Sequence, residues 1–166
     1  AVVTAGAPLV RRATLDDLEA VAVLTERLVA FDAQFGWVTV RPSTPAAIRL
    51  DLAHQVLVEG GHWCWVAELD GAVTGMVTVM SPARCEWIAQ QVHASPVAYV
   101  GTVFVPARAR GRGVASALIA RVHAHAAAAG VRTMTLHHAL PNPLSTVFWA
   151  RQGYRPIYTQ WTRHLA

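Results

Sequence analysis

The strongest constraint on the fold lies in the middle of the chain, where a strand pattern, a short loop and a long helical pattern follow one another without a break. Residues 98–105 are apolar and rich in β-branched side chains, and residues 113–129 carry apolar side chains at helical spacing. Gly130 ends the helix, and residues 132–137 return to a strand pattern. A strand, a helix and a strand in succession form a crossover, so the two strands are predicted to be parallel.

The loop of this crossover, residues 108–113, reads Arg-Ala-Arg-Gly-Arg-Gly. The first amides of a helix have no partner within the helix, and the helix dipole places about half a positive charge there. Glycines let the backbone approach a ligand closely, and arginines add positive field. The loop therefore predicts a site for phosphate or pyrophosphate. It is neither a P-loop, which needs Gly-Lys followed by Ser or Thr, nor the Gly-x-Gly-x-x-Gly dinucleotide motif.

The other elements are predicted from apolar spacing and from residues that begin or end helices and strands. Thr14 and Thr44 precede helical patterns, so each is expected to cap a helix, and Asp70-Gly71 is typical of a hairpin turn. Further strands are expected at residues 9–12, 63–69, 73–80 and 157–165, and further helices at about 14–31, 44–60 and 143–152. With the crossover, this order predicts an α/β (α+β) fold in which helices cover both faces of a mixed sheet.

The length of 166 residues predicts one domain, residues 1–166, with residues 1–7 as a flexible tail. No apolar run approaches the roughly 18 residues of a membrane span, and residues 1–10 lack the basic start of a signal peptide. Cys64 and Cys85 have no metal-ligand spacing, so we expect reduced thiols, a core position for Cys64 and no metal site. Together these features predict a cytoplasmic protein without a membrane partner.

The net charge of +4 limits the choice of partners. All 14 basic residues are arginines, and they are scattered along the chain except at 108–112. A nucleic-acid-binding module would need a longer basic stripe, and an anionic cofactor explains the local cluster more economically, so we expect no nucleic acid. The positive balance also disfavours polycationic substrates such as aminoglycosides, because they would be repelled.

Three segments together resemble the GCN5-related N-acetyltransferase (GNAT) family. The loop has the Arg-x-x-Gly-x-Gly pattern of that family's coenzyme A loop, residues 103–106 resemble its fourth strand, and residues 142–154 resemble its segment of an Asn, a small residue, two aromatics and Gly-aromatic. The resemblance implies a mixed sheet of six to seven strands with about four helices and a splayed central parallel pair. It also implies an N-acetyltransferase that moves an acetyl group from acetyl-CoA to a primary amine of a small molecule.

The resemblance assigns a cofactor site to the end of the fourth strand, the loop, the start of the following helix and the segment after Asn142. Strand backbone at Val103 and Val105 would pair with the pantetheine arm, and amides from about Ala109 to Ala115 would hold the pyrophosphate. The residues expected to contact the cofactor are Val103, Phe104, Val105, Arg108, Ala109, Arg110, Gly111, Arg112, Gly113, Val114, Ala115, Asn142, Ser145, Phe148 and Trp149.

The catalytic groups are harder to assign, because Trp149 stands where the family often has a tyrosine that protonates the leaving thiolate. An indole supplies no useful proton at neutral pH. We expect Ser145, one helical turn earlier, to hydrogen-bond the sulfur, Tyr99 to hold a water or the substrate, and Asn142 either to cap the short helix or to bind the cofactor. The general base stays open among Glu86, His93, His137, His138 and a water chain.

The same resemblance places the acceptor pocket at the first two helices and the loop between them. Phe31, Asp32, Phe35 and Trp37 are expected there, with Glu86 as a further substrate residue. Aromatic side chains and a single acid suit an ammonium group on an apolar or aromatic body, although packing in the core explains them equally simply. The alternative function is a degenerate family member that binds acyl-CoA without efficient turnover. A homodimer is left open.

Overall fold

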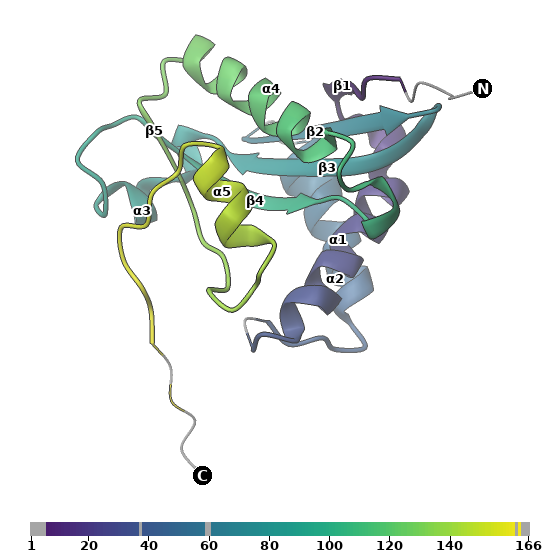
Figure 1. The fold of residues 1–166 in the computed structure, drawn as a ribbon, viewed down its shortest axis with the longest axis horizontal. Coiled ribbons are helices and arrows are strands. Elements are labelled where there is room, and N and C mark those ends of the chain that lie inside the picture. The colour runs from purple at the N-terminus through teal and green to yellow at the C-terminus, as the bar shows by residue number, and fades with distance from the viewer. Residues whose placement is uncertain (1–5, 37, 59–60, 162, 164–166) are drawn as a thin grey trace.

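The computed structural model describes residues 6–36, 38–58, 61–161 and 163. The predicted tail at residues 1–7 therefore lies mostly outside the described residues. One five-stranded sheet crosses the molecule in the order β1-β2-β3-β4-β5, where neighbours along the chain are also neighbours in the sheet (Figure 1). The strands are β1 Leu9–Arg12, β2 His62–Leu69, β3 Ala72–Met80, β4 Val97–Phe104 and β5 Thr133–Leu136. Only β4 and β5 are parallel, as the crossover predicts.

Helices cover both faces of this sheet, and α4 lies on the face opposite α1 and α2 (Figure 1). A 3₁₀ turn, Leu15–Asp17, leads into α1, and a π-helical segment, Leu52–Val58, continues α2. The helices are α1 Leu18–Ala33, α2 Thr44–Asp51, α3 Glu86–Ala89, α4 Val114–Ala128 and α5 Ser145–Arg151. None of the described helices is long and apolar enough to cross a membrane.

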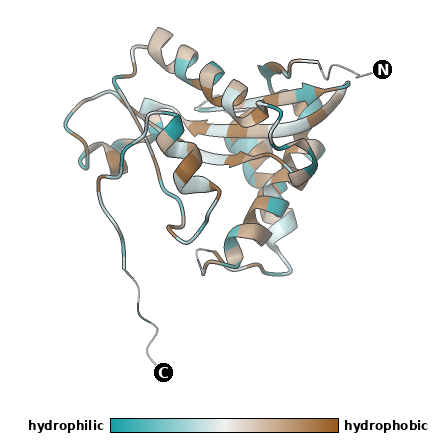
Figure 2. Ribbon diagram, viewed as in Figure 1, coloured by the Kyte–Doolittle hydropathy of each residue, from teal (hydrophilic) through white to brown (hydrophobic). Residues whose placement is uncertain are grey.

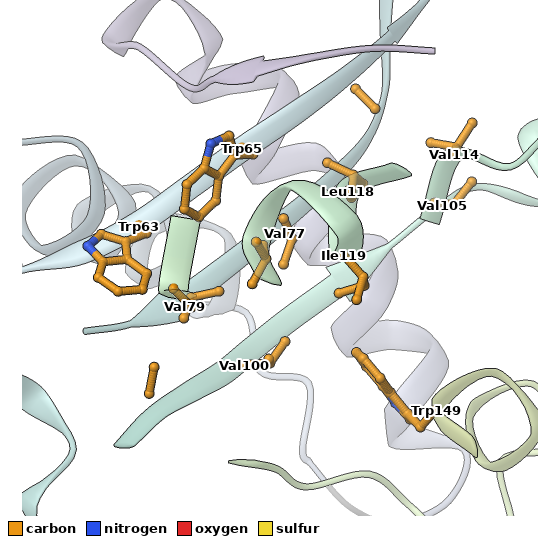
Figure 3. Packing of buried hydrophobic residues seen from close by; sticks show 14 of the residues in the cluster. Trp63, Trp65, Val77, Val79, Val100, Val105, Val114, Leu118, Ile119 and Trp149 are labelled. Atoms are coloured by element: carbon orange, nitrogen blue, oxygen red, sulfur yellow. The ribbon is translucent and has the colours of Figure 1, made fainter. Parts of the chain in front are cut away.

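The core has two layers because both faces of the central strands are covered. Along β2, Trp63 and Trp65 face α4 while Cys64 and Val66 face α1, as the alternation of a strand requires. Such a strand appears in the sequence as a continuous apolar run, and apolar residues follow the strands in Figure 2. Figure 3 shows the layer under α4, whose labelled side chains include Leu118, Ile119, Val77, Val79, Val100 and Trp149.

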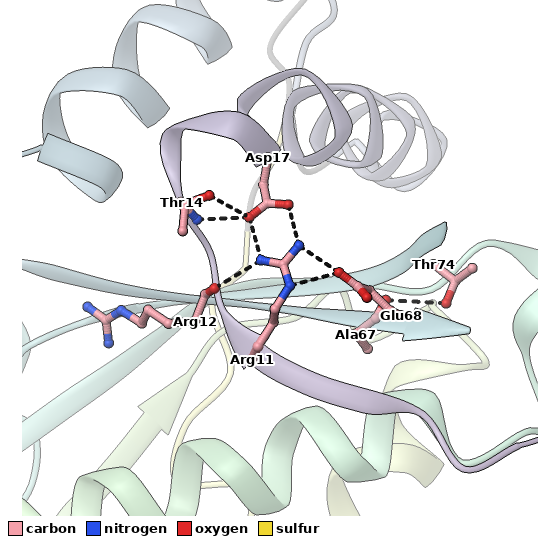
Figure 4. Close-up of polar contacts among 7 residues, drawn as sticks. All are labelled: Arg11, Arg12, Thr14, Asp17, Ala67, Glu68 and Thr74. Carbon is pink, nitrogen blue, oxygen red and sulfur yellow. Dashed lines mark hydrogen bonds and ion pairs between the residues drawn. The ribbon is translucent and has the colours of Figure 1, made fainter. Parts of the chain in front are cut away.

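An ion-pair cluster joins β1, at the edge of the sheet, to the start of α1 (Figure 4). The Arg11 guanidinium donates to both carboxylate oxygens of Asp17, at 2.7 and 2.8 Å, and to Oε1 of Glu68, at 2.7 Å from Nε. The Thr14 amide also donates to Asp17, at 2.8 Å. The hydrogen bonds from Arg11 lower the pKa of the buried Asp17. The cluster therefore fixes where β1 ends and α1 begins.

The parallel pair of β4 and β5 lies at one edge of the described sheet rather than at its centre, and it separates halfway along β4. The pairing with β5 runs only from Val97, opposite Thr133, to Val100, opposite Leu136, whereas β4 continues to Phe104. A bulge lies at the same point, because Thr78 and Val79 of β3 oppose Thr102 and Val100, which leaves Gly101 as the extra residue. Gly101–Phe104 therefore presents one edge that β5 does not cover, which confirms the splayed pair.

Three expectations about elements need correction. The sheet of the described residues has five strands rather than six to seven, and they come with five α-helices rather than about four. The predicted strand at 157–165 is absent from the described residues 154–161 and 163, and this segment runs away from the sheet in Figure 1. Its β-rich composition is a propensity that needs a paired neighbour. Finally, Ser43 precedes α2, so Thr44 is its first residue rather than its cap.

Candidate active site

A cleft of about 580 Å³ opens where β4 and β5 separate. Its walls are the uncovered part of β4, the end of β5 with the residues after it, the first turn of α4, the last turns of α1, and α5. These elements come from distant parts of the chain. The cleft brings together most of the residues expected to bind cofactor or substrate: Phe31, Asp32, Tyr99, Val103, Phe104, Val105, Ala109, Arg110, Gly111, Gly113, Val114, Ala115, Asn142, Ser145, Phe148 and Trp149.

The arginine- and glycine-rich loop forms the end of the cleft at the first turn of α4. Gly111 and Gly113 have φ angles of 75° and 76°, a left-handed conformation that side chains rarely adopt, and Gly113 immediately precedes α4. Arg110 borders the cleft, and its Nε donates to the carbonyl of Val105 at 3.1 Å. The loop thus turns the unpartnered amides of a 15-residue helix toward the cleft.

Two of the three loop arginines do not line the cleft. Arg112 points to the hairpin turn between β2 and β3, where its Nη2 lies 3.5 Å from a carboxylate oxygen of Asp70. Arg108 lies in the 3₁₀ turn Ala107–Ala109 and is exposed. Of the three, only Arg110 is therefore placed to contact a ligand in the cleft. The other two add positive electrostatic potential from outside the cleft.

The segment after β5 forms another wall. The side chain of Asn142 is buried, and its Oδ1 accepts a hydrogen bond from the amide of Leu144 at 3.0 Å, which caps the approach to α5. Ser145 is the first residue of α5 and lines the cleft. Trp149, one turn later, is buried, and the ring of Tyr154 packs edge-on against it with centroids 5.2 Å apart. The indole is therefore a wall of the cleft and a part of the core.

The tyrosine that follows α5 belongs to the core. The hydroxyl of Tyr154 pairs with Nε2 of His123 on α4 at 3.1 Å, and burial raises the pKa of Tyr154 to about 12. Neither side chain lines the cleft. This pair ties the segment that follows α5 to α4, outside the cleft.

The expected acceptor residues divide into three groups. Phe31 and Asp32, in the last turn of α1, line the cleft, and burial raises the pKa of Asp32. Phe35 packs edge-on against Phe31, with ring centroids 5.4 Å apart, but does not line the cleft. Trp37 lies outside the described residues. Glu86 is an exposed residue of α3 and lies away from the cleft, which leaves Asp32 as the only acid among the described lining residues.

A hydrogen-bonded chain that the sequence did not reveal lies beside the end of β5. The hydroxyl of Tyr99 is 3.0 Å from Nδ1 of His137, and Nε2 of His137 contacts the hydroxyl of Tyr158. Trp87 stacks on the ring of His137 and packs against Tyr99. The sequence could name Tyr99 and His137 as separate candidates, but only the parallel register of β4 and β5 brings them together.

The four titratable side chains considered as a general base are also separated by the structure. His137 and His138 follow β5 and line the cleft. Glu86 and His93 lie in the segment between β3 and β4 and do not line it. Burial lowers the pKa of His137, so its imidazole is neutral at pH 7 and can accept a proton.

Comparisons with known proteins agree with this geometry. The model of a family described as acetyltransferase (GNAT) matches residues 30–154. No curated protein sequence matches the chain. Among solved structures, the aminoglycoside N-acetyltransferase AAC(6')-Iy in complex with CoA is similar with a TM-score of 0.77 and 22% identity, over 99% of both chains.

Two further solved structures show the same fold. The aminoglycoside 6'-N-acetyltransferase AAC(6')-IG from Acinetobacter haemolyticus has a TM-score of 0.71 and 20% identity, over 95% of this chain and 97% of that one. A protein described as a transcriptional regulator from Bacillus halodurans C-125 has a TM-score of 0.71 and 19% identity, over 95% of this chain and 99% of that one. At these identities the likeness shows a common architecture.

Proposed function

This chain belongs to the acetyltransferase (GNAT) family, whose members use acetyl-CoA, and we propose that it transfers the acetyl group directly to the primary amine of a small molecule. The observation that carries this proposal is the cleft itself, in which an uncovered strand edge leads to the amino end of α4. A long thioester with a diphosphate at one end needs both features. In this reading, the amides from Ala109 to Ala115 hold the pyrophosphate.

The uncovered edge of β4 offers backbone groups for the pantetheine arm and for the thioester carbonyl. The amide of Thr102 donates to Oγ1 of Thr78 on β3, at 3.1 Å. Because successive amides of a strand point to opposite edges, the amide of Val103 is directed to the edge that β5 leaves open. That amide stabilises the oxyanion that forms when an amine attacks the carbonyl.

The leaving thiolate meets Ser145 and Trp149 rather than a tyrosine hydroxyl. With a thiol pKa near 8.5, expulsion of the thiolate at pH 7 is uphill by about 1.5 pKa units, or about 2 kcal/mol. A hydrogen bond from Ser145 to the sulfur offsets part of this cost. The reaction thus proceeds without a strong acid, but more slowly than with one.

The acceptor is a small molecule with one ammonium group on an apolar body. Asp32 supplies one carboxylate at the carboxyl end of α1, where the helix dipole also favours a cation. Leu28, Val29 and Phe31 supply apolar surface beside it. An aminoglycoside carries several ammonium groups, and the described lining offers them a single acid together with Arg110 and Arg151. We therefore expect acceptors unlike those named for the structural neighbours.

The cofactor site is tested with two glycines at opposite ends of α4. Gly113 and Gly130 have φ angles of 76° and 74°, and an added Cβ meets no atom within 4 Å at either position. Gly113→Val and Gly130→Val therefore impose a similar backbone strain. We expect calorimetric titration with CoA to show affinity reduced at least about tenfold for Gly113→Val and unchanged for Gly130→Val. Equal affinities in the two variants would refute the loop assignment.

The enzymatic reaction is tested by thiol release from acetyl-CoA over a panel of amines. Monoamines with apolar or aromatic bodies should be acetylated, and kanamycin and spermidine should be poor acceptors. The alternative function, binding of acyl-CoA without efficient turnover, is favoured by the lack of an acid at Trp149. Tight binding of CoA with no thiol release above background on any amine would establish that alternative.

A further inference from the structure

The hydrogen-bonded chain beside β5 has properties that the acetyl-transfer proposal does not use. Tyr99 lines the cleft, and its hydroxyl lies 3.0 Å from the ring of His137, which lines the cleft too. His137 is held on three sides, by Tyr99 from β4, by Trp87 from α3 and by Tyr158 from the C-terminal segment. A histidine fixed in this way is oriented to exchange a proton with one partner, here the tyrosine that faces the cleft.

We propose that the hydroxyl of Tyr99 and the imidazole of His137 form the path by which the attacking amine loses its proton. This inference rests on the proposed acetyl transfer and adds the route of the proton to it. Tyr99 touches the reacting nitrogen, and His137 acts through Tyr99. Tyr99 and His137 take the place of a carboxylate as the group that accepts the proton. The only described acid that lines the cleft, Asp32, is used to hold the ammonium group.

The protonation states of the two groups suit this path. Burial raises the pKa of Tyr99, so the phenol stays protonated and passes a proton on without becoming the base. Burial lowers the pKa of His137 below 6.5, so the imidazole is unprotonated at pH 7 and receives that proton. Both Tyr99 and Tyr158 contact its ring, and the raised pKa of Tyr99 keeps the phenol on the cleft side protonated at pH 7.

The protons balance as follows. As the nitrogen approaches the thioester, its first proton passes to the oxygen of Tyr99 while the hydroxyl proton of Tyr99 passes to Nδ1 of His137. The N–C bond then forms, the C–S bond breaks, and the second proton of the nitrogen ends on the thiolate. His137 returns its proton to water. The sum is an ammonium ion and acetyl-CoA giving an amide, CoA and one proton.

The test uses pH profiles of kcat/KM for the best amine of the panel, chosen with a pKa above about 9 so that its own ionisation lies outside the range of His137. For the wild type we expect a fall in rate below pH 6.5, as His137 becomes protonated and can no longer accept. Tyr99→Phe and His137→Gln should each lower kcat at least about tenfold at pH 7 and abolish this fall. KM for acetyl-CoA should stay within about twofold in both variants.

A second tyrosine–histidine pair in the same protein provides matched controls. His123 and Tyr154 lie at 3.1 Å, burial lowers the pKa of His123 as it does that of His137, and neither residue lines the cleft. His123→Gln and Tyr154→Phe should therefore keep both the rate and the pH profile of the wild type. The variant Tyr99→Phe/His137→Gln should lose no more than the worse single variant, because both lie on one path.

Three outcomes separate the inference from the function on which it rests. An acidic fall that persists in His137→Gln, or losses that multiply in the double variant, would overturn the relay and leave acetyl transfer intact. The same loss of the acidic fall in His123→Gln would also overturn it. Absence of acetylation in the wild type on every amine would instead overturn the proposed function.

Discussion

Arg11 connects three parts of the chain through one side chain. Its guanidinium contacts Asp17 at the start of α1 and Glu68 on β2 while the residue itself belongs to β1. From the sequence, Asp17 is only an acid in the first turn of a helix. Its pairing with Arg11 depends on the path of the chain between β1 and α1, and the contact with Glu68 depends on how β1 registers with β2, where Leu9 opposes Glu68.

Asp17→Asn should lower the free energy of unfolding by about 2 kcal/mol at pH 7, because charged hydrogen bonds to a buried oxygen are lost. The pKa of Asp17 lies below its ordinary value of 3.8, so the carboxylate is favoured in the folded state. Its contribution is complete at neutral pH and is lost as the pH falls through the lowered pKa. Urea unfolding at pH 7 and pH 3 should show the difference between wild type and variant shrinking at the lower pH.

Asp16 provides the control, since it lies on the same turn and is exposed. Asp16→Asn should change the unfolding free energy by no more than about 0.5 kcal/mol. An equal loss in both variants would mean that the helix dipole, and not the cluster around Arg11, is what Asp17 stabilises.

Single residues of the cleft were predictable where the signal is local. Gly111 and Gly113 are recognisable because the turn and the helix start that need them are adjacent in the sequence. Glu86 was assigned to the substrate by its residue type alone, and the structure puts it on the exposed side of α3. The partner of Tyr99 could not be named, since His137 reaches it only through the pairing of two strands.

At the scale of elements, the crossover from β4 through α4 to β5 was predictable almost residue by residue, because each boundary carries its own signal. The strand predicted at 157–165 was wrong for the described residues there, because strand pairing depends on a neighbouring strand that no local pattern specifies. The short helix α3 was missed for a related reason: four residues give no periodicity to detect. The splay of β4 and β5 has one local sign, a glycine inside a strand pattern at Gly101.

The seating of α4 on the sheet depends on one glycine of β3. A Cβ added at Gly75 would lie 2.8 Å from Cγ1 of Val114 and 3.2 Å from side-chain atoms of Leu118 and Val105. Gly75→Ala should therefore push the first turn of α4 outward and lower the free energy of unfolding by about 1–3 kcal/mol. Because that turn borders the cleft, the affinity for CoA should fall as well, which titration calorimetry would measure beside urea unfolding.

A second variant, Val114→Ala, tests whether the contact between the new Cβ and Val114 causes these effects. Val114→Ala alone leaves a small cavity and costs stability, but in the Gly75→Ala protein it removes the atom that the new Cβ meets. The double variant should therefore be more stable than the sum of the two single effects predicts, by at least about 0.5 kcal/mol. Simple additivity would show that α4 accommodates the methyl group without displacement.

At the scale of the whole molecule, the two cysteines lie in different clusters of the core. Cys64 lies within β2 in the layer beneath α1, and burial raises the pKa of its thiol to about 12. Cys85 belongs to a smaller cluster with Ile88 and Val97 beside α3. Exposure of Cys64 requires the central sheet to open, whereas exposure of Cys85 requires only that α3 leave β4.

Alkylation by iodoacetamide, followed by peptide mass spectrometry, should therefore label Cys85 faster than Cys64 in the native protein. Acetyl-CoA has no free thiol, and at about 100 times its Kd it stabilises the folded state by about 2.7 kcal/mol. Because the cleft is built from both layers, this stabilisation should slow the alkylation of Cys64 about 100-fold and that of Cys85 less. In a Cys85→Ser variant, alkylation of Cys64 can be followed alone. If acetyl-CoA left the rate of Cys64 alkylation unchanged, β2 would open while the cleft stays formed.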